Sequence, residues 1–434
     1  MRFTTHSLIN DRHEDTEEKM KNKTIIEIKT IKEKSTAGEG QTIDVLVRVV
    51  PPERNNTESK RPKLNLSVVL DRSGSMGGEK MQYAREAAKY CIDQMLTTDR
   101  LSTVIFDQSV DVLIPSQEVR NKAAMRSEID RIEARGSTAL HEAWVRGGLQ
   151  VSDHLDNDAI NRVLLITDGQ ANVGETNVNT IVHQTRELGN RGISTSTIGI
   201  GRDFNEDLLM PMAEAGNGNS WHVQEPDDMQ RIFEVELKGL IAQVGHSVTF
   251  GIKPKEGVRV VELLNDLERD PSGRYKLPNL QSGSPLEIVV RLAVPTTEAG
   301  ATLHLADFDL SYIGQDSKLP EKSKAKFQVE FAAAEVVDAL EEDPSVAQAV
   351  LLLINARARR EVAEHIDRGD PRSAKSSLAA AMGATDQMFL RAPSPELRKE
   401  LNDLAGIDEA LDIDDMLARK LGLYQRYNRR TGKE

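Results

Sequence analysis

The chain has little cysteine, few aromatic residues and no long apolar run, and each shortage excludes a class of protein. A single cysteine, Cys91, stands among 434 residues, so neither an internal disulfide nor a CxxC zinc site can form. Aromatic residues make up 4% of the chain, which leaves few stacking platforms for single-stranded nucleic acid. The longest apolar stretch, Val346–Ile354, is well short of the about 18–20 residues that span a bilayer. These shortages predict no membrane span and no redox chemistry.

Basic residues are also in deficit. The chain has 56 Lys and Arg against 69 Asp and Glu, a net charge of −13. This balance argues against a mainly electrostatic hold on nucleic acid or on an anionic membrane. Residues 1–22 form a polar N-terminal segment that lacks the apolar core of a signal peptide. We therefore expect a cytoplasmic protein that has no nucleic-acid partner.

Residues 61–244 have the pattern of an α/β domain. Buried-looking apolar runs alternate there with amphipathic segments of helix length, which is typical of a parallel sheet covered on both faces. The helix that begins near Lys80 carries Cys91 on its apolar face, so we expect this cysteine in the core. The apolar runs are Leu64–Leu70, Leu101–Phe106, Val163–Ile166 and Ile193–Ile200.

Short alternating strands lie on both sides of this domain. Two of them, within Thr24–Val50, cannot form a stable sheet alone. We therefore expect residues 23–60 and 245–331 to form one composite antiparallel β-sandwich, with the α/β domain inserted through a linker at Pro51–Lys63. From residue 332 to 434 the strands give way to Ala-rich and Leu-rich helical spacing, which predicts a helical C-terminal domain.

Three polar loops of the α/β domain can supply ligands for a metal ion. Two of the loops follow apolar strands and one lies between helical segments, and ligands in doubly wound sheets bind at the carboxyl ends of strands. The loops offer oxygen atoms only, which suits a hard divalent cation such as Mg²⁺, Mn²⁺ or Ca²⁺ rather than zinc. The candidate ligands are Asp71, Ser73, Ser75, Thr138 and Asp168.

This set resembles the metal-ion-dependent adhesion site of the von Willebrand factor type A (VWA) domain, whose pattern is DxSxS, then a Thr, then the Asp of a TDG-type turn. All five positions match. The resemblance covers roughly Leu64–Val244 and includes the IGIG and DFNEDLL turns at Ile198–Leu209 and the GNGNSW segment before the last helix. It implies a doubly wound, Rossmann-like VWA domain of a bacterial intracellular type.

The resemblance also implies how the site works. The hydroxyls of Ser73, Ser75 and Thr138 would contact the metal, while Asp71 and Asp168 act directly or through water. The cation, Mg²⁺ before Mn²⁺ or Ca²⁺, would then keep an open position for an Asp or Glu side chain of a partner protein. On this interpretation the protein is a non-catalytic interaction module, and its helical tail could oligomerise or bind a second partner.

Other interpretations remain open at this point. Asp71 and Ser73 could merely cap the following helix. A metal-dependent hydrolase would need a general base, for which Glu175 is the nearest candidate in sequence. By family analogy, intracellular relatives often serve an AAA+ ATPase, kinase or phosphatase as accessory subunits. No GxxxxGK[ST] or complete GxGxxG loop supports nucleotide binding, and His141 lacks the second histidine of an HExxH motif.

Several charged motifs have simpler explanations. Arg368-Gly369-Asp370 fits a turn between two helices, because Gly ends helices and Asp caps them. Arg72, between the candidate ligands, is expected to face solvent, with a contact at the rim of the site as the alternative. The basic cluster of Arg357, Arg359 and Arg360 is expected to be a solvated helix face, with docking of an acidic partner as the alternative. The same expectation and the same alternative apply to the C-terminal LYQRYNRR segment.

Overall fold

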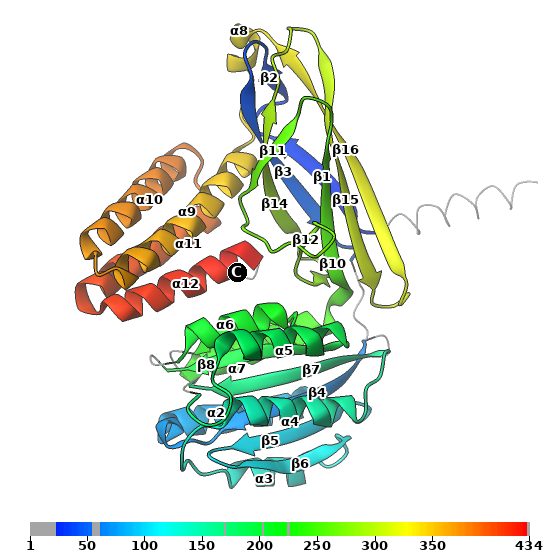
Figure 1. Ribbon diagram of the computed structural model, residues 1–434, viewed down its shortest axis with the longest axis vertical. Helices are drawn as coiled ribbons and strands as arrows, with labels where there is room; N and C mark the ends of the chain where they lie inside the picture. The colour runs from blue at the N-terminus through cyan, green and yellow to red at the C-terminus, as the bar shows by residue number, and fades with distance from the viewer. Residues whose placement is uncertain (1–22, 54–60, 169–170, 202–203, 224–225, 432–434) are drawn as a thin grey trace, which may run out of the picture. The chain divides into compact units, whose positions relative to one another are not determined.

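The computed structural model describes residues 23–53, 61–168, 171–201, 204–223 and 226–431 (Figure 1). The chain divides into two compact units, one from Asn56 to Ala242 and the other made from the chain up to Asn55 and from Gln243 onward. The polar segment 1–22 and the middle of the expected linker lie outside the described residues. No helix in the described ranges is long and apolar enough to cross a membrane.

The unit from Asn56 to Ala242 contains a mixed six-stranded sheet in the order β6-β5-β4-β7-β8-β9. The expected parallel strands are present, but β6 is antiparallel to β5. The difference arises because β6 follows β5 after a short turn, and so short a connection can only reverse the chain. The strands are β4 (Lys63–Asp71), β5 (Arg100–Phe106), β6 (Val110–Glu118), β7 (Ala159–Thr167), β8 (Ile193–Ile200) and β9 (Ser220–Val223).

Helices cover both faces of this sheet, so the doubly wound arrangement is present. One apolar cluster packs α2, α3 and α7 on one face, and a second packs α4, α5 and α6 on the other. Cys91 of α2 is fully buried in the first cluster, as predicted. The helices are α2 (Glu79–Gln94), α3 (Lys122–Asp130), α4 (Leu140–Ser152), α5 (Val178–Asn190), α6 (Glu206–Ala215) and α7 (Pro226–Ile241), with a 3₁₀ turn η2 (Gly74–Met76) before α2.

The other unit has two sheets around one apolar core. The first sheet has the order β1-β3-β14-β11 and the second β12-β10-β15-β16-β2, with β13 paired to β10. Its strands are β1 (Ile25–Thr30), β2 (Lys34–Thr36), β3 (Gln41–Val50), β10 (Gln243–Pro254), β11 (Arg259–Leu263), β12 (Tyr275–Lys276), β13 (Leu280–Gln281), β14 (Leu286–Val294), β15 (Thr302–Gly314) and β16 (Pro320–Ala332).

Strands from before and after the α/β unit are hydrogen-bonded to each other in these sheets. Val47 of β3 lies opposite Ile288 of β14 in an antiparallel pair, and Ser35 of β2 lies opposite Phe331 of β16 in a parallel one. The second sheet is therefore not wholly antiparallel. Since β2 reaches β16 from the opposite sheet and not through a hairpin, no tight turn dictates an antiparallel direction there.

The C-terminal helices have an apolar cluster of their own, and α9 also packs on the first sheet, so that the helices belong to the same compact unit as the two sheets (Figure 1). Val346 and Leu353 of α9 are buried against Leu46 of β3 and Val289 of β14. Gly369 has φ +71°, and the Asp370 side chain accepts the N–H of Ser373, which confirms the turn between two helices. The helices are α8 (Ala334–Asp338), α9 (Pro344–Asp367), α10 (Pro371–Arg391), α11 (Pro395–Ile413) and α12 (Asp415–Thr431).

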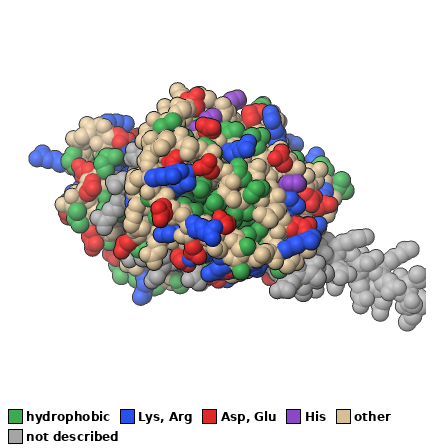
Figure 2. Space-filling view, turned by 90° about the horizontal axis from the view of Figure 1, so that it is seen from below, with side chains coloured by type: hydrophobic (Ala, Val, Ile, Leu, Met, Phe, Trp, Pro, Cys, Tyr) green, Lys and Arg blue, Asp and Glu red, His purple; other side chains and the backbone are tan. Residues whose placement is uncertain are grey.

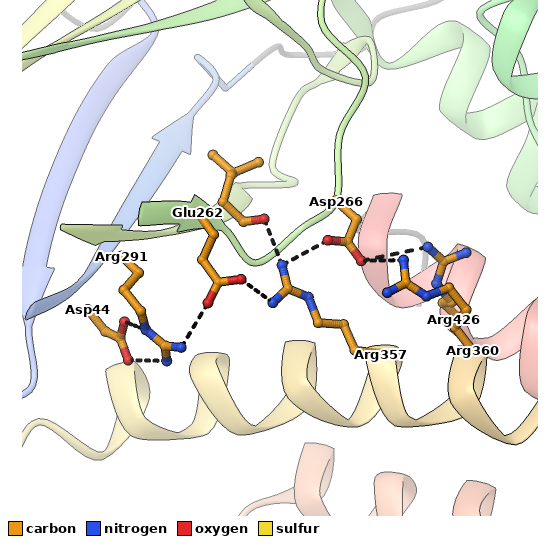
Figure 3. Close-up of polar contacts among 8 residues, drawn as sticks. Asp44, Glu262, Asp266, Arg291, Arg357, Arg360 and Arg426 are labelled. Carbon is orange, nitrogen blue, oxygen red and sulfur yellow. Dashed lines mark hydrogen bonds and ion pairs between the residues drawn. The ribbon is translucent and has the colours of Figure 1, made fainter. Parts of the chain in front are cut away.

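The prediction that the basic cluster on α9 is a solvated face is wrong. Arg359 is 1% exposed and donates to Glu400 of α11 at 2.9 Å. Arg357 donates to Glu262 at 2.6 Å and to Asp266 at 2.8 Å (Figure 3). The acidic partners lie far away in the sequence, so local charge patterning could not reveal them. They neutralise arginines that would otherwise be costly to bury.

Asp266 is the centre of this junction between the helices and the first sheet (Figure 3). Its carboxylate also meets Arg360 at 3.5 Å and Arg426 of α12 at 3.7 Å, so a single acid faces three arginines. Its backbone carbonyl accepts a hydrogen bond from Arg430 at 3.1 Å. The residue has φ +50°, a conformation that Asp and Asn tolerate better than other side chains. Asp266 therefore fastens α9 and α12 to the loop after β11.

Replacing Asp266 by Asn should loosen this junction. The substitution keeps the backbone conformation but leaves three partly buried arginines short of negative charge, so we expect a loss of about 1–3 kcal/mol in the free energy of unfolding. Denaturant unfolding measures the loss, and hydrogen exchange should locate it in α9 and α12. Glu361→Gln, at an exposed position of α9, is the control. Equal stability of the two variants would show that Asp266 does not fasten the helices.

Candidate metal centre

The candidate ligands lie at one edge of the α/β sheet. Asp71 is the last residue of β4, and Asp168 directly follows β7. These two strands are hydrogen-bonded neighbours, with Leu70 opposite Ile166, so their carboxyl ends meet. Thr138 precedes α4 by two residues. The residues after Asp168, 169–170, lie outside the described part of the chain.

Backbone hydrogen bonds fasten the three loops to one another. Gly74 donates to the carbonyl of Gly136 at 3.0 Å, and Arg135 donates to that of Arg72 at 2.6 Å. The Thr138 N–H donates to the Asn172 side chain at 2.8 Å, and the Thr138 carbonyl accepts the N–H of Asn172 at 3.2 Å. The loop of Asp71–Ser75 is thus hydrogen-bonded to the loop of Arg135–Thr138, and the latter to Asn172 in the chain after β7. The structure therefore brings all three predicted loops together.

Asp71 is fully buried and anchored. One carboxylate oxygen accepts the N–H of Ser73 at 2.7 Å, and the other accepts the hydroxyl of Thr167 at 2.5 Å. Burial raises the pKa of Asp71 to about 6; the negative charge of Asp168 adds to the rise, and the hydrogen bonds from Thr167 and Ser73 oppose it. The ionised site is thus short of positive charge.

The two serines place their hydroxyls next to each other. The Ser73 and Ser75 oxygens lie 3.1 Å apart; Ser73 is buried and Ser75 is exposed. Thr138 is 2% exposed. Across the described ranges, no group of three or more His, Cys, Asp or Glu side chains could hold a metal ion. A metal site at this edge of the sheet would therefore need oxygen ligands besides its two carboxylates, and the hydroxyls of Ser73, Ser75 and Thr138 are available.

Asp168 has a buried carboxylate oxygen that no donor satisfies. Its Oδ2 atom lies 3.3 Å from the ammonium of Lys80, whereas Oδ1 has no hydrogen-bond partner among the described residues. Leaving a buried carboxylate oxygen unsatisfied is costly. A divalent cation next to Oδ1 would supply the missing positive charge. The residues therefore fit the cation that the sequence predicts.

Asp168 is unusual among the buried acids of the described chain. Six carboxylates belong to residues that are at most 1% exposed. Five of them accept donors on both oxygens, and only Asp168 has an orphaned oxygen. The five satisfied acids are Asp71, Asp99, Asp107, Glu236 and Glu400.

The prediction that Arg72 faces solvent is wrong. Its guanidinium lies 3.0 Å from Asp107 and 2.6 Å from Asp111, and the residue is 9% exposed. Burial raises the pKa of Asp107, but Arg135, the donors of Ser109 and the charge of Arg72 together lower it to about 2. Asp107 directly follows β5, the neighbour of β4, which the local sequence could not show. Arg72 is thus neutralised beside the site and does not serve as its counter-charge.

Two further residues of the site escaped the sequence analysis. Thr167 holds Asp71 through its hydroxyl, and its place beside Asp168 in the Thr-Asp-Gly turn was an available signal. Lys80, the second residue of α2, pairs with Asp168, and only its short distance after the first loop hinted at this. His141 contacts Gln184 at 2.6 Å, and Glu175 accepts the N–H of Asn177 at 2.7 Å.

Comparisons with known proteins agree with the α/β fold of this unit. The family model for the von Willebrand factor type A domain matches residues 65–235. An uncharacterized protein of Synechocystis sp. is 29% identical over 191 residues, which are 43% of this chain and 44% of that protein. The protein YfbK of Escherichia coli is 26% identical over 205 residues, 47% of this chain and 36% of its own. The matched part spans less than half the length of these relatives.

Solved structures resemble a larger part of the chain. A von Willebrand factor type A protein from Catenulispora acidiphila aligns with a TM-score of 0.69 at 16% identity, covering 93% of this chain and 96% of that one. The ArnB paralog VWA2 from Sulfolobus acidocaldarius aligns with a TM-score of 0.60 at 16% identity, covering 95% and 99%. At these identities the likeness establishes the fold alone. Together with the family match, it shows that residues 65–235 of this chain form a von Willebrand factor type A domain.

Proposed function

We propose that the VWA domain binds one divalent cation and uses it to capture a carboxylate of a partner protein. Ser73, Ser75 and Thr138 bind the cation through their hydroxyls, and Asp71 and Asp168 bind it directly or through water. The orphaned Oδ1 atom of Asp168 carries this proposal, because every comparably buried acid of the described chain has donors on both oxygens. An oxygen-only set favours Mg²⁺, with Mn²⁺ or Ca²⁺ as alternatives.

Neutral ligands leave the cation electrophilic. Three hydroxyls withdraw little of its positive charge, so it attracts an external anion at its open position. The exposed Ser75 is where such an anion would arrive. On the face drawn in Figure 2, acidic and basic side chains are interspersed and do not form a large area of one sign. A cation site supplies the specificity for a carboxylate that mixed surface charge does not.

A purely binding role is also part of the proposal. A hydrolase that uses a metal to activate water needs a general base beside it. The two candidates in this region are engaged elsewhere, since His141 contacts Gln184 and Glu175 accepts from the backbone of Asn177. The five ligands themselves include no histidine or glutamate. We therefore propose that the site carries out no chemistry.

We propose that the VWA domain is inserted into the other unit, which contains the two β-sheets and the C-terminal helices. Hydrogen bonds between β3 and β14 join the chain before the domain to the chain after it, which supports an inserted arrangement. The C-terminal helices would be available to oligomerise or bind a second partner. The single, fully buried cysteine suits the cytoplasm, where thiols stay reduced.

Removing one hydroxyl should weaken metal binding and leave the fold intact. Thr138→Val keeps the shape of the side chain, so we expect metal affinity to fall at least about tenfold while stability stays within about 1 kcal/mol. Calorimetric titration with Mg²⁺ and Mn²⁺ measures the affinity. Ser137→Ala, one residue away and outside the ligand set, is the matched control. Wild-type protein that gives no signal at millimolar metal would contradict the proposed site.

The raised pKa of Asp71 gives a pH prediction for the metal-free protein. Because burial lifts this pKa from 3.8 to about 6, the folded state binds the proton more tightly than the unfolded state. The contribution of Asp71 is therefore most favourable below pH 4 and is lost as pH rises to 6, by about 2–3 kcal/mol. The difference between wild type and Asp71→Asn in EDTA should show this loss. A difference that does not change with pH would refute it.

Partner capture should depend on the same residues. In affinity purification from native lysate, wild type and Ser137→Ala should retain a protein in Mg²⁺ that is lost in EDTA and with Thr138→Val. Substituting one Asp or Glu of that protein by Asn or Gln should then release it, because the carboxylate completes the metal coordination. Metal-dependent turnover of a phosphoester, peptide or ester, abolished by Thr138→Val, would instead show an enzyme.

A further inference from the structure

We infer that Lys80 is a built-in counter-cation of the metal site, which weakens metal binding and leaves the loaded site positively charged toward its anionic ligand. The inference rests on the proposed function. Its starting point is the ion pair of 3.3 Å between the Lys80 ammonium and Asp168 Oδ2. The ammonium thus occupies one oxygen of the carboxylate, and the other oxygen, Oδ1, stays available for the metal.

The fold provides a place for this lysine. Lys80 lies in the first turn of α2 and is 27% exposed, whereas Asp168 is almost completely buried. Gly201 directly follows β8 and has φ +80°; a Cβ atom built on it would lie 2.8 Å from the Cε atom of Lys80. A larger residue at position 201 would therefore push the lysine chain aside. The absence of a side chain at Gly201 thus leaves room for the lysine chain to reach Asp168.

A count of charges shows what the lysine does. Asp71 and Asp168 bring two negative charges, and Lys80 returns one positive charge. Arg72 and Arg135 do not change this balance, because they are paired with Asp107 and Asp111. The metal-free site therefore carries a net charge of −1, and a divalent cation changes it to +1. Without Lys80 the loaded site would be neutral and would attract a carboxylate less strongly.

The same charge must oppose the metal. A positive group close to the cation repels it in a partly buried site, where screening by solvent is weak. Lys80 therefore lowers metal affinity and raises affinity for the anion that follows. These opposite effects on metal binding and anion binding distinguish a counter-cation from a residue that merely positions Asp168. Loss of a merely positioning residue would weaken metal binding.

The test compares Lys80→Met, which removes the charge, with Lys80→Arg, which keeps it. Calorimetric titration with Mn²⁺ at low ionic strength should show Lys80→Met binding the metal at least about fivefold more tightly than wild type, with Lys80→Arg within about twofold. In EDTA, Lys80→Met should melt at a lower temperature than wild type, and saturating Mn²⁺ should close the gap. Acetate, added to the Mn²⁺-loaded proteins and followed by water proton relaxation, should bind more weakly to Lys80→Met.

The outcomes separate this inference from the proposed function. If wild type and Ser137→Ala bind Mn²⁺ but Lys80→Met binds it equally or more weakly, the counter-cation role is wrong and the metal site stands. Equal acetate binding by wild type and Lys80→Met would likewise overturn the role toward the anion. If wild type binds no Mn²⁺, both the proposed function and this inference fail.

Discussion

Two carboxylates buried at the ends of adjacent strands are the constraint on which the α/β unit depends. Because β4 and β7 are hydrogen-bonded neighbours up to Leu70 and Ile166, the sheet holds the backbone of Asp71 close to that of Asp168. Burial raises the pKa of Asp71, and the negative charge of Asp168 adds to the rise. Ser73 and Thr167 donate to Asp71, whereas among the described residues the one cation paired with Asp168 is Lys80 of α2. The geometry of the sheet thus maintains a deficit of positive charge at this edge.

The neighbouring charges show that this deficit is confined to the site. Arg72 lies within the same loop, yet it pairs with Asp107 and Asp111. A guanidinium directed at Asp168 would neutralise it permanently, since arginine stays protonated and holds carboxylates in a bidentate fork. A lysine ammonium is a compact point charge on a flexible stem, and one oxygen of Asp168 remains accessible beside it. A lysine beside Asp168, unlike an arginine, therefore leaves this carboxylate able to bind a metal ion.

The sequence predicted the parts of the fold that local patterns control. Apolar runs located the strands, helical spacing located α2 with Cys91 in the core, and the Gly369-Asp370 turn followed from backbone preferences. The family motif predicted the domain now established at residues 65–235. The roles of Asp71 and Thr138 as ligands remain predictions, although the structure places their loops side by side.

Contacts between distant segments could not be predicted in this way. Arg357 and Arg359 look like a solvated basic run until the fold brings Asp266 and Glu400 to them. Both pairs hold elements together, and every oxygen of Glu400 has a donor. A buried acid with a structural role is fully satisfied, because an unsatisfied one would cost stability. Asp168 departs from that rule in a loop at a strand end, which is where a binding site can tolerate the cost and a metal ion can remove it.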